Sequence, residues 1–205
     1  MRNATPASRS RRQSTSIVLG LVSGLALSIP ITYGLVKWES VNRGVAVNHW
    51  QVSFGTGNYG HRYLLRAAIA AYSLGNAIPE EALFFHAFED SQGRALSGEH
   101  RYRIIFAKGQ FPPVGAFWSL TAYNAKDSLL VHNPIQRYSI SDRTPGVQAS
   151  ADGSLSFTLE HTAPSLANNW LPVPQDGFTV TLRTYMPKPE LLNLQWKPPA
   201  IERMD

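Results

Sequence analysis

The sequence predicts a mainly β protein: an antiparallel sandwich or jelly-roll-like domain with one N-terminal amphipathic helix, preceded by one transmembrane helix. Three observations lead to this fold class. An uncharged run of 21 residues lies close to the N-terminus, a helical stripe of apolar residues follows it, and the rest of the chain alternates apolar with polar residues. Strands with one wet face, joined by short turns, are typical of antiparallel sheets.

The N-terminal segment divides into a basic tail, residues 1–15, and a transmembrane anchor, residues 16–36. An α-helix needs about 20 apolar residues to cross the hydrocarbon core of a bilayer. Because arginines precede the anchor, the positive-inside rule predicts a single pass through the inner (cytoplasmic) membrane, with a cytoplasmic N-terminus and a periplasmic, extracytoplasmic domain. A cleaved signal peptide is the alternative, although its apolar core is usually only about 7–15 residues long.

The charge balance excludes one class of partner. Four of the 19 Lys and Arg residues lie in the tail, which leaves 15 against 14 Asp and Glu in the rest of the chain. This near-neutral remainder has no basic excess that would predict nucleic-acid binding. The chain has no cysteine, which excludes disulfides, thiolate metal sites and cysteine nucleophiles.

Residues 37–58 are predicted as a juxtamembrane linker, and residues 59–205 as the β-rich domain. The domain opens with a helix that Gly75-Asn76 would end, because Gly and Asn are common helix stops. Its apolar stripe is made by Leu64, Leu65, Ala68, Ile69 and Tyr72.

A glycine motif, G-x-G-x-x-G, follows an apolar, strand-like run of Trp50, Val52 and Phe54 and opens this helix, at Gly55, Gly57 and Gly60. A dinucleotide site would need these glycines inside a parallel strand-helix-strand unit. The later strands are antiparallel in character and no second helical crossover follows, so we predict no cofactor. The glycines instead allow a sharp bend, since Gly adopts positive φ at little steric cost.

Five apolar alternations predict half-buried strands after the helix, at residues 84–89, 102–106, 118–123, 155–160 and 178–183. Asp90–Gly93 and Asp152-Gly153 are turn signals, and the second is typical of a two-residue hairpin. Trp118 alternates with Leu120, which predicts that this tryptophan lies in the core.

Further collinear blocks run through the predicted domain. They are Tyr63–Ala67, Pro79–Glu81, Phe111–Val114, Phe117–Thr121, Asn133–Pro134, Arg137–Ile140, Asp142–Arg143, Ala151–Leu155, Asn169–Pro172, Tyr185–Pro189 and Trp196–Pro199. From about Tyr59 to Met204, roughly 70% of the chain, they resemble a bacterial family known as domain of unknown function 1214. The resemblance implies a β-rich jelly-roll or sandwich domain and no settled activity. In many relatives this domain looks like the C-terminal half of a larger protein, after a domain numbered 1254, so a companion protein carrying that domain is an expected partner.

A polar cluster between two turns supplies the candidate ligand-binding residues Arg137, Tyr138, Asp142 and Arg143, with Trp170 as a surface aromatic. The arginines would bind a carboxylate or a sugar acid through the planar guanidinium, and Asp142 would act as acid or base. In the alternative, structural interpretation, Asp142 caps the turn and the arginines pair with nearby acids or carbonyl groups.

The remaining sequence contains no catalytic signature. The six histidines are scattered singly, without the spacing of metal ligands, so no metal site is predicted. We therefore predict a membrane-anchored, extracytoplasmic binding or assembly module of the bacterial cell envelope rather than an enzyme. The alternative is an envelope enzyme, or a glycan- or carboxylate-binding protein, that uses the Arg/Tyr/Asp pocket.

Overall fold

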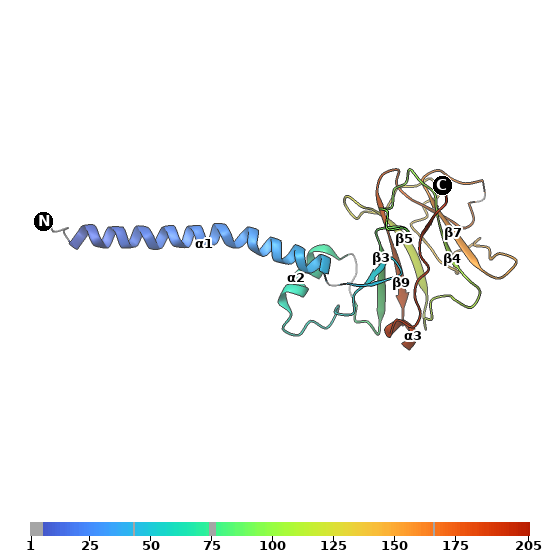
Figure 1. The fold of residues 1–205 in the computed structure, drawn as a ribbon, viewed down its shortest axis with the longest axis horizontal. Coiled ribbons are helices and arrows are strands. Elements are labelled where there is room, and N and C mark those ends of the chain that lie inside the picture. Colours follow the sequence, from blue (N-terminus) through green and yellow to red (C-terminus); the bar gives the residue numbers. More distant parts are fainter. Residues whose placement is uncertain (1–5, 43, 74–76, 166) are drawn as a thin grey trace.

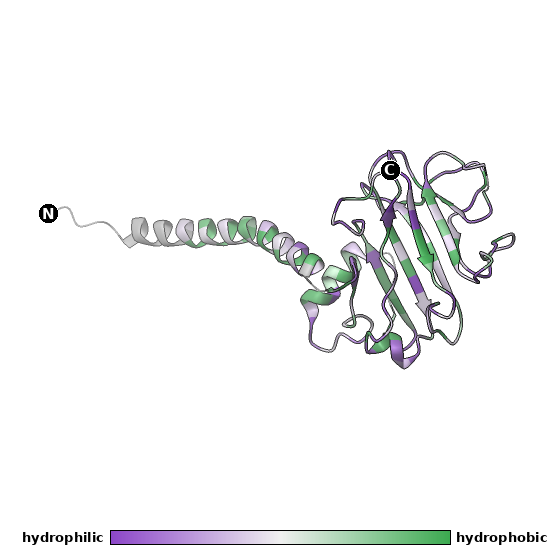
Figure 2. Ribbon diagram, turned by 45° about the vertical axis from the view of Figure 1, so that its right-hand side comes forward, coloured by the Kyte–Doolittle hydropathy of each residue, from purple (hydrophilic) through white to green (hydrophobic). Residues whose placement is uncertain are grey.

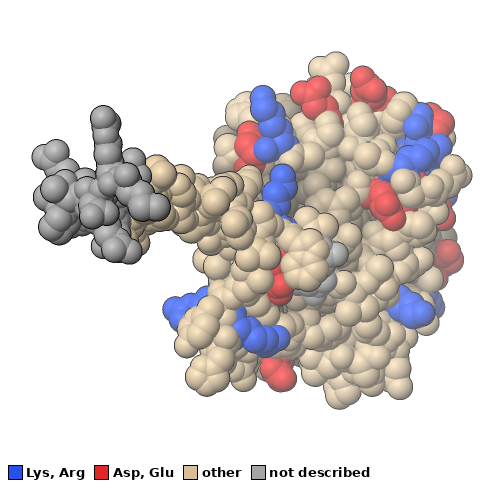
Figure 3. Space-filling model, turned by 60° about the vertical axis from the view of Figure 1, so that its left-hand side comes forward, with Lys and Arg blue, Asp and Glu red and all other residues tan. Residues whose placement is uncertain are grey.

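A long helix, α1 (Pro6–Asn42), projects from a β-sandwich in the computed structural model, which describes residues 6–42, 44–73, 77–165 and 167–205 (Figure 1). Its apolar stretch, Thr15–Val41, has 27 residues and is long and apolar enough to cross a membrane. Between the residues drawn in grey and the domain, the visible part of this helix shows no acidic or basic side chain (Figure 3). The predicted apolar helix is thus confirmed, and it continues past residue 36.

Helix α2 (Tyr63–Tyr72) lies beside the C-terminal end of α1. Leu65, Ala68 and Ile69 of the predicted stripe are its buried residues, as expected for one face of a helix. The predicted stop at Gly75-Asn76 lies outside the described residues.

Two sheets form the sandwich, and neither closes into a barrel. The six-stranded sheet is antiparallel throughout and has, in spatial order, β1 (Val45–Val47), β2 (Trp50–Val52), β3 (Ala82–Ala87), β9 (Phe178–Tyr185), β5 (Trp118–Asn124) and β6 (Ser139–Ile140). The four-stranded sheet has β10 (Glu202–Arg203), β4 (Tyr102–Phe106), β7 (Leu155–Glu160) and β8 (Trp170–Pro172). In this second sheet β7 and β8 run parallel. A short helix, α3 (Pro189–Leu192), follows β9. The predicted antiparallel, mainly β fold is confirmed.

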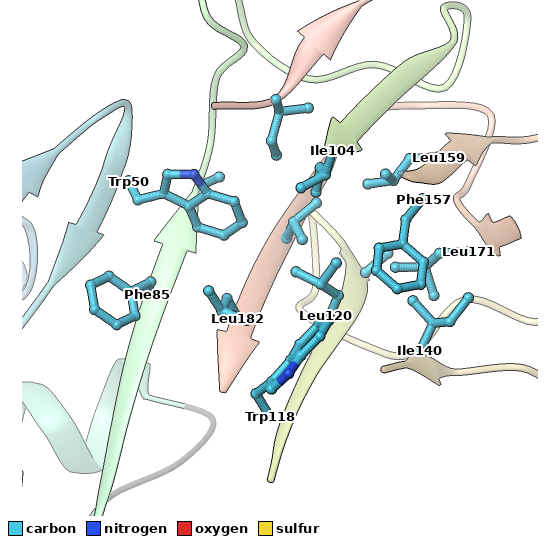
Figure 4. Packing of buried hydrophobic residues seen from close by; sticks show 14 of the residues in the cluster. Trp50, Phe85, Ile104, Trp118, Leu120, Ile140, Phe157, Leu159, Leu171 and Leu182 are labelled. Atoms are coloured by element: carbon cyan, nitrogen blue, oxygen red, sulfur yellow. The ribbon is translucent and has the colours of Figure 1, made fainter. Parts of the chain in front are cut away.

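The hydrophobic core lies between the two sheets, where side chains from both meet (Figure 4). Hydrophobic residues recur along the strands (Figure 2) because alternate positions point inward. Trp118 is 2% exposed and packs against Phe106 and Phe157, so its predicted core position is confirmed.

The prediction that residues 37–58 form a linker is wrong for most of that segment. Residues 37–42 continue α1, and β1 and β2 extend the six-stranded sheet from β3. Trp50 is fully buried, and its indole N–H donates to the Pro199 carbonyl over 2.8 Å. The alternation of Trp50 with Val52 therefore marks the first part of the core rather than a spacer.

The glycine motif forms a bend between β2 and α2. Gly57 and Gly60 have φ values of +83° and +50°, which confirms the predicted use of positive φ. A Cβ atom on Gly57 would lie 2.5 Å from the backbone nitrogen of Ile78, so the chain passes very close to it there. Since β2 and β3 are antiparallel neighbours, the flanking elements do not form the parallel unit that a dinucleotide site requires.

The turn at Asp90–Gly93 is also confirmed, and a buried carboxylate organises it. Asp90 accepts hydrogen bonds from the backbone N–H groups of Gln92 and Arg94 and from the Arg94 side chain at 2.7 Å. Burial alone would raise the pKa of Asp90, but these hydrogen bonds and the Arg94 charge outweigh it and lower the pKa. The ionised carboxylate therefore stabilises the folded turn.

Candidate binding site on the outer sheet face

The six-stranded sheet has a second face, on the side away from the core, which we call the outer face. The strand register places one polar residue from each of five strands directly opposite the next across this face. These residues are Gln51, His86, Thr181, Thr121 and Ser139. The outer face is thus a continuous surface built from segments far apart in the sequence.

Arg183, on the central strand β9, is the main charged group of the outer face. Its guanidinium carbon lies 5.9 Å from the centre of the Phe84 ring and 5.4 Å from the centre of the Tyr123 ring. One of its Nη atoms donates to the Tyr123 hydroxyl. In the described part of the chain no carboxylate forms an ion pair with Arg183. The cation is therefore held by aromatic rings and a phenol and keeps donors for another acceptor.

The contact between Arg183 and Tyr123 covers two threonines. The register pairs Arg183 with Ser119 and Tyr123 with Thr179, so the Thr121–Thr181 pair lies between them. These two threonines are 5% and 3% exposed, although they belong to the outer face. The low exposure of the two threonines therefore agrees with cover by the joined Arg183 and Tyr123 side chains.

Aromatic side chains continue the outer face beyond Arg183. Phe117 and Tyr185 are stacked with ring centres 4.4 Å apart, and Phe84 meets Tyr185 edge to face at 6.4 Å. Phe117 is 41% exposed, so part of this stack is open to solvent. Rigid aromatics around an arginine are the composition that protein interfaces favour.

A small cavity of about 70 Å³ lies at one side of the outer face, where the sheet meets the ends of α1 and α2. Phe84, His86 and Phe88 of β3 and its continuation line it from the sheet, and Ser40 and Ser73 line it from the helices. His86 also contacts the Thr181 hydroxyl at 3.1 Å. Pockets for drug-sized ligands are typically about 300–1,000 Å³, so this cavity suits a single functional group.

The side chain of Arg137, a predicted site residue, is hydrogen-bonded to the backbone of the domain. One of its Nη atoms donates to the carbonyl oxygens of Ala167, Asn168 and Trp170, at 2.8, 3.0 and 2.8 Å. The buried Asn133 side chain holds the same loop, because it both donates to and accepts from the Arg137 backbone. This arrangement matches the structural interpretation of Arg137, in which the arginine pairs with carbonyl groups.

Of the other predicted residues, Trp170 contacts the Arg137 side chain through its backbone carbonyl. Trp170 is 1% exposed and donates its indole N–H to the Glu160 carbonyl, so the prediction of a surface aromatic is wrong. Arg143 donates to the Ala116 carbonyl, while Tyr138 and Asp142 are exposed. Within the described chain, side-chain hydrogen bonds join Arg137 to Trp170 and join no other pair of this set.

Among the described residues no group of three or more His, Cys, Asp or Glu side chains could hold a metal ion. His49 contacts Glu89 at 3.0 Å on the surface, and His161 contacts the Val173 carbonyl. Each of these two contacts orients one histidine side chain.

Sequence reasoning missed Arg183, Tyr123 and Phe84 as a group. Each lies on a strand that the sequence predicts, at a position that alternates with buried residues. The available signal was an arginine, Arg183, that follows threonines on the polar side of residues 178–183. No local pattern in the sequence shows the strand order that places Arg183 between the two aromatic residues.

The chain is similar to known proteins in its family and in its fold. The family model described as "Protein of unknown function (DUF1214)" matches residues 81–189, more than half of the chain. The VPA0106 protein from Vibrio parahaemolyticus has a similar structure, with a TM-score of 0.61 and 23% identity, over 100% of this chain and 47% of its own. This chain thus spans about half the length of that protein. A putative uncharacterized protein from Burkholderia cenocepacia gives a TM-score of 0.40 and 15% identity over 88% of this chain and 42% of its own. No curated protein matches the chain.

Proposed function

We propose that this chain, which belongs to the DUF1214 family of proteins of unknown function, is a membrane-anchored binding module of the bacterial cell envelope. Helix α1 anchors it in the inner membrane, and the sandwich lies outside the cytoplasm. A partner protein binds the outer face and brings a carboxylate to Arg183. The observation that carries this proposal is a half-buried guanidinium held by Phe84 and Tyr123, with no carboxylate partner among the described residues.

The chemistry of the outer face supports a protein partner. Binding energy in protein interfaces concentrates in arginine and large aromatic side chains at the centre of the contact. Arg183 and Tyr123 are already fixed by their mutual hydrogen bond, so little side-chain entropy is lost when a partner binds. The Phe117–Tyr185 stack supplies apolar surface next to the charge.

The sheet edges favour recognition through a face rather than through strand addition. The edge strands β1 and β6 have three and two residues. Short edges offer few free backbone groups to an incoming strand. The partner is therefore expected to place side chains on the outer face, across β3, β9 and β5.

The site favours binding over catalysis. The cavity beside the outer face is small. Arg137, which the alternative enzyme pocket would use, donates its side-chain hydrogen bonds to three carbonyl groups of the fold. A companion chain carrying the domain numbered 1254 is the proposed partner, because that domain accompanies this one in many relatives.

Site-specific photo-crosslinking in native membranes tests this function. A photoreactive amino acid replaces Phe117 on the outer face, and Met204, 45% exposed beside β10 of the other sheet, is the matched control position. We expect one discrete crosslinked product from position 117, which mass spectrometry identifies as the companion chain, and none from position 204.

The same experiment with arginine variants tests the role of the charge. Arg183→Gln should reduce the product by about tenfold or more, because losing a hot-spot charge pair costs at least about 2 kcal/mol. Arg101→Gln, which removes an arginine with a 56% exposed side chain elsewhere, should leave the product unchanged. Equal crosslinking from positions 117 and 204, or no effect of Arg183→Gln, would refute the proposed function.

A further inference from the structure

Helix α2 has an unusual position for a helix of this domain. Among the described helices and strands it packs against α1 and against no other element. Of its ten residues only Arg66 is charged. Its exposed side, away from Leu65, Ala68 and Ile69, carries Tyr63, Ala67 and Ala70. The helix therefore presents an almost uncharged surface that the sandwich does not cover.

The length of α1 sets the height of α2 relative to a bilayer. At about 1.5 Å per residue, the 27 residues of Thr15–Val41 extend roughly 40 Å. The hydrocarbon core is only about 30 Å thick, so the last two turns of the apolar stretch extend into the headgroup region. Helix α2 packs against α1, and the Tyr72 side chain of α2 lies near that of Tyr33 on α1. This contact joins α2 directly to the apolar helix.

The side chains around this contact are those that the interface of a bilayer favours. Tyr63, Tyr72 and Trp38 are 69%, 44% and 60% exposed. Tyr and Trp concentrate at the headgroup level, where the ring is in apolar surroundings and the polar atom meets water. Arg66 is exposed at the side of α2, in reach of lipid phosphates. Arg62 instead folds back onto the carbonyls of Gly55 and Asn58.

We propose that α2 is an interfacial helix, which lies in the headgroup region of the same bilayer leaflet from which α1 emerges. Its partner is the lipid surface, which contacts Tyr63, Ala67 and Ala70. The inference rests on the anchoring role of α1 in the proposed function, but it holds for either orientation of the chain in the membrane. Two contacts with the bilayer, α1 and α2, then hold the sandwich at one height and one tilt.

Fluorescence quenching by lipids tests the position of α2. The chain has no cysteine, so a single introduced thiol gives one labelled site in the full-length protein. An environment-sensitive dye is attached to Ala70→Cys on α2, to Leu27→Cys in the middle of the apolar stretch, or to Ala151→Cys in the turn before β7. Each protein is reconstituted into phosphatidylcholine vesicles with a quencher placed either near the headgroup or deep in the acyl chain.

The three labels give distinct expected results. The label at position 70 should show blue-shifted emission and should be quenched more strongly by the shallow quencher. The label at position 27 should be quenched more strongly by the deep quencher, and the label at position 151 should be quenched by neither. If position 70 behaves like position 151 while position 27 is quenched, the interfacial helix is refuted and the anchor stands. If position 27 is not quenched, the anchor itself is refuted. Circular dichroism of each labelled protein checks that the variant is folded.

Discussion

Replacement of Gly57 by alanine is predicted to destabilise the protein much more than the same replacement at Gly60. Both residues have positive φ, of +83° and +50°, and a left-handed conformation costs an L-residue about 1–2 kcal/mol. The two sites differ in space. The new methyl group at position 57 would lie 2.5 Å from the Ile78 nitrogen and 2.7 Å from the Ala77 carbonyl carbon, whereas at position 60 nothing lies within 4 Å.

The magnitude follows from adding the two costs. Overpacking against a fixed backbone costs about 1–3 kcal/mol, so Gly57→Ala should lose roughly 2–5 kcal/mol of unfolding free energy. At Gly60 the strain is partly offset by about 0.4–1 kcal/mol, because alanine restricts the unfolded chain. With about 2–4 °C per kcal/mol for a domain of this size, the midpoint should fall by roughly 4–20 °C for Gly57→Ala and by less than about 6 °C for Gly60→Ala.

Thermal unfolding of the full chain in detergent, followed by tryptophan fluorescence, measures this difference. Trp50 reports on the strand that leads into the bend, since its side chain is fully buried. If both variants lower the midpoint equally, the close approach of residues 57 and 78 does not exist in the protein. The account of the glycine motif as a packed bend would then be incorrect.

Three further predictions concern groups inside the domain. Because the pKa of Asp90 is lowered in the folded protein, its contribution to stability is complete above the ordinary value of 3.8 and is lost as the pH falls toward the folded-state value. The urea midpoint of the native protein should therefore fall on acidification, and that of Asp90→Asn should fall less steeply and be lower at neutral pH. Equal dependence of the two urea midpoints on pH would contradict this. Arg137→Lys should lower the unfolding free energy by about 1–3 kcal/mol, because a lysine ammonium cannot reproduce the hydrogen bonds of the guanidinium to three carbonyl groups. A urea midpoint unchanged within error would rule out the structural role of Arg137. Trp170→Phe should lower the unfolding free energy by about 1 kcal/mol, because the hydrogen bond to the Glu160 carbonyl is lost. The crosslink from position 117 should remain. If a stable Trp170→Phe variant lost that crosslink, Trp170 would belong to the binding site.

Much of the architecture follows from periodicity in the sequence. The strand at residues 102–106 and the core position of Trp118 follow from alternation, and α2 follows from an apolar stripe. Strand β1 was missed because three residues are too few to show a period. The place of β1 and β2 in the sheet depends on the pairing of β1 with β2 and of β2 with β3, which no local pattern encodes.

The candidate site was harder to predict than the fold. Phe84, Tyr123 and Arg183 come from three strands, and only the order β3-β9-β5 makes them neighbours. Trp170 was misjudged because asparagines precede it, which normally indicates exposure. The Asn169 side chain in fact donates to the carbonyls of Gln148 and Ser156, so the polar loop is tied down and the tryptophan beside it is buried.

Strand β9 comes late in the chain and pairs on both sides, with β3 and with β5. During synthesis, β3 and β5 are made before residues 178–185, so each has one unpaired edge until β9 is added. Contacts between such distant segments slow folding, and unpaired edges in the incomplete chain favour aggregation. A chain cut before residue 178 would lack the strand that joins β3 to β5, so its six-stranded sheet would remain incomplete.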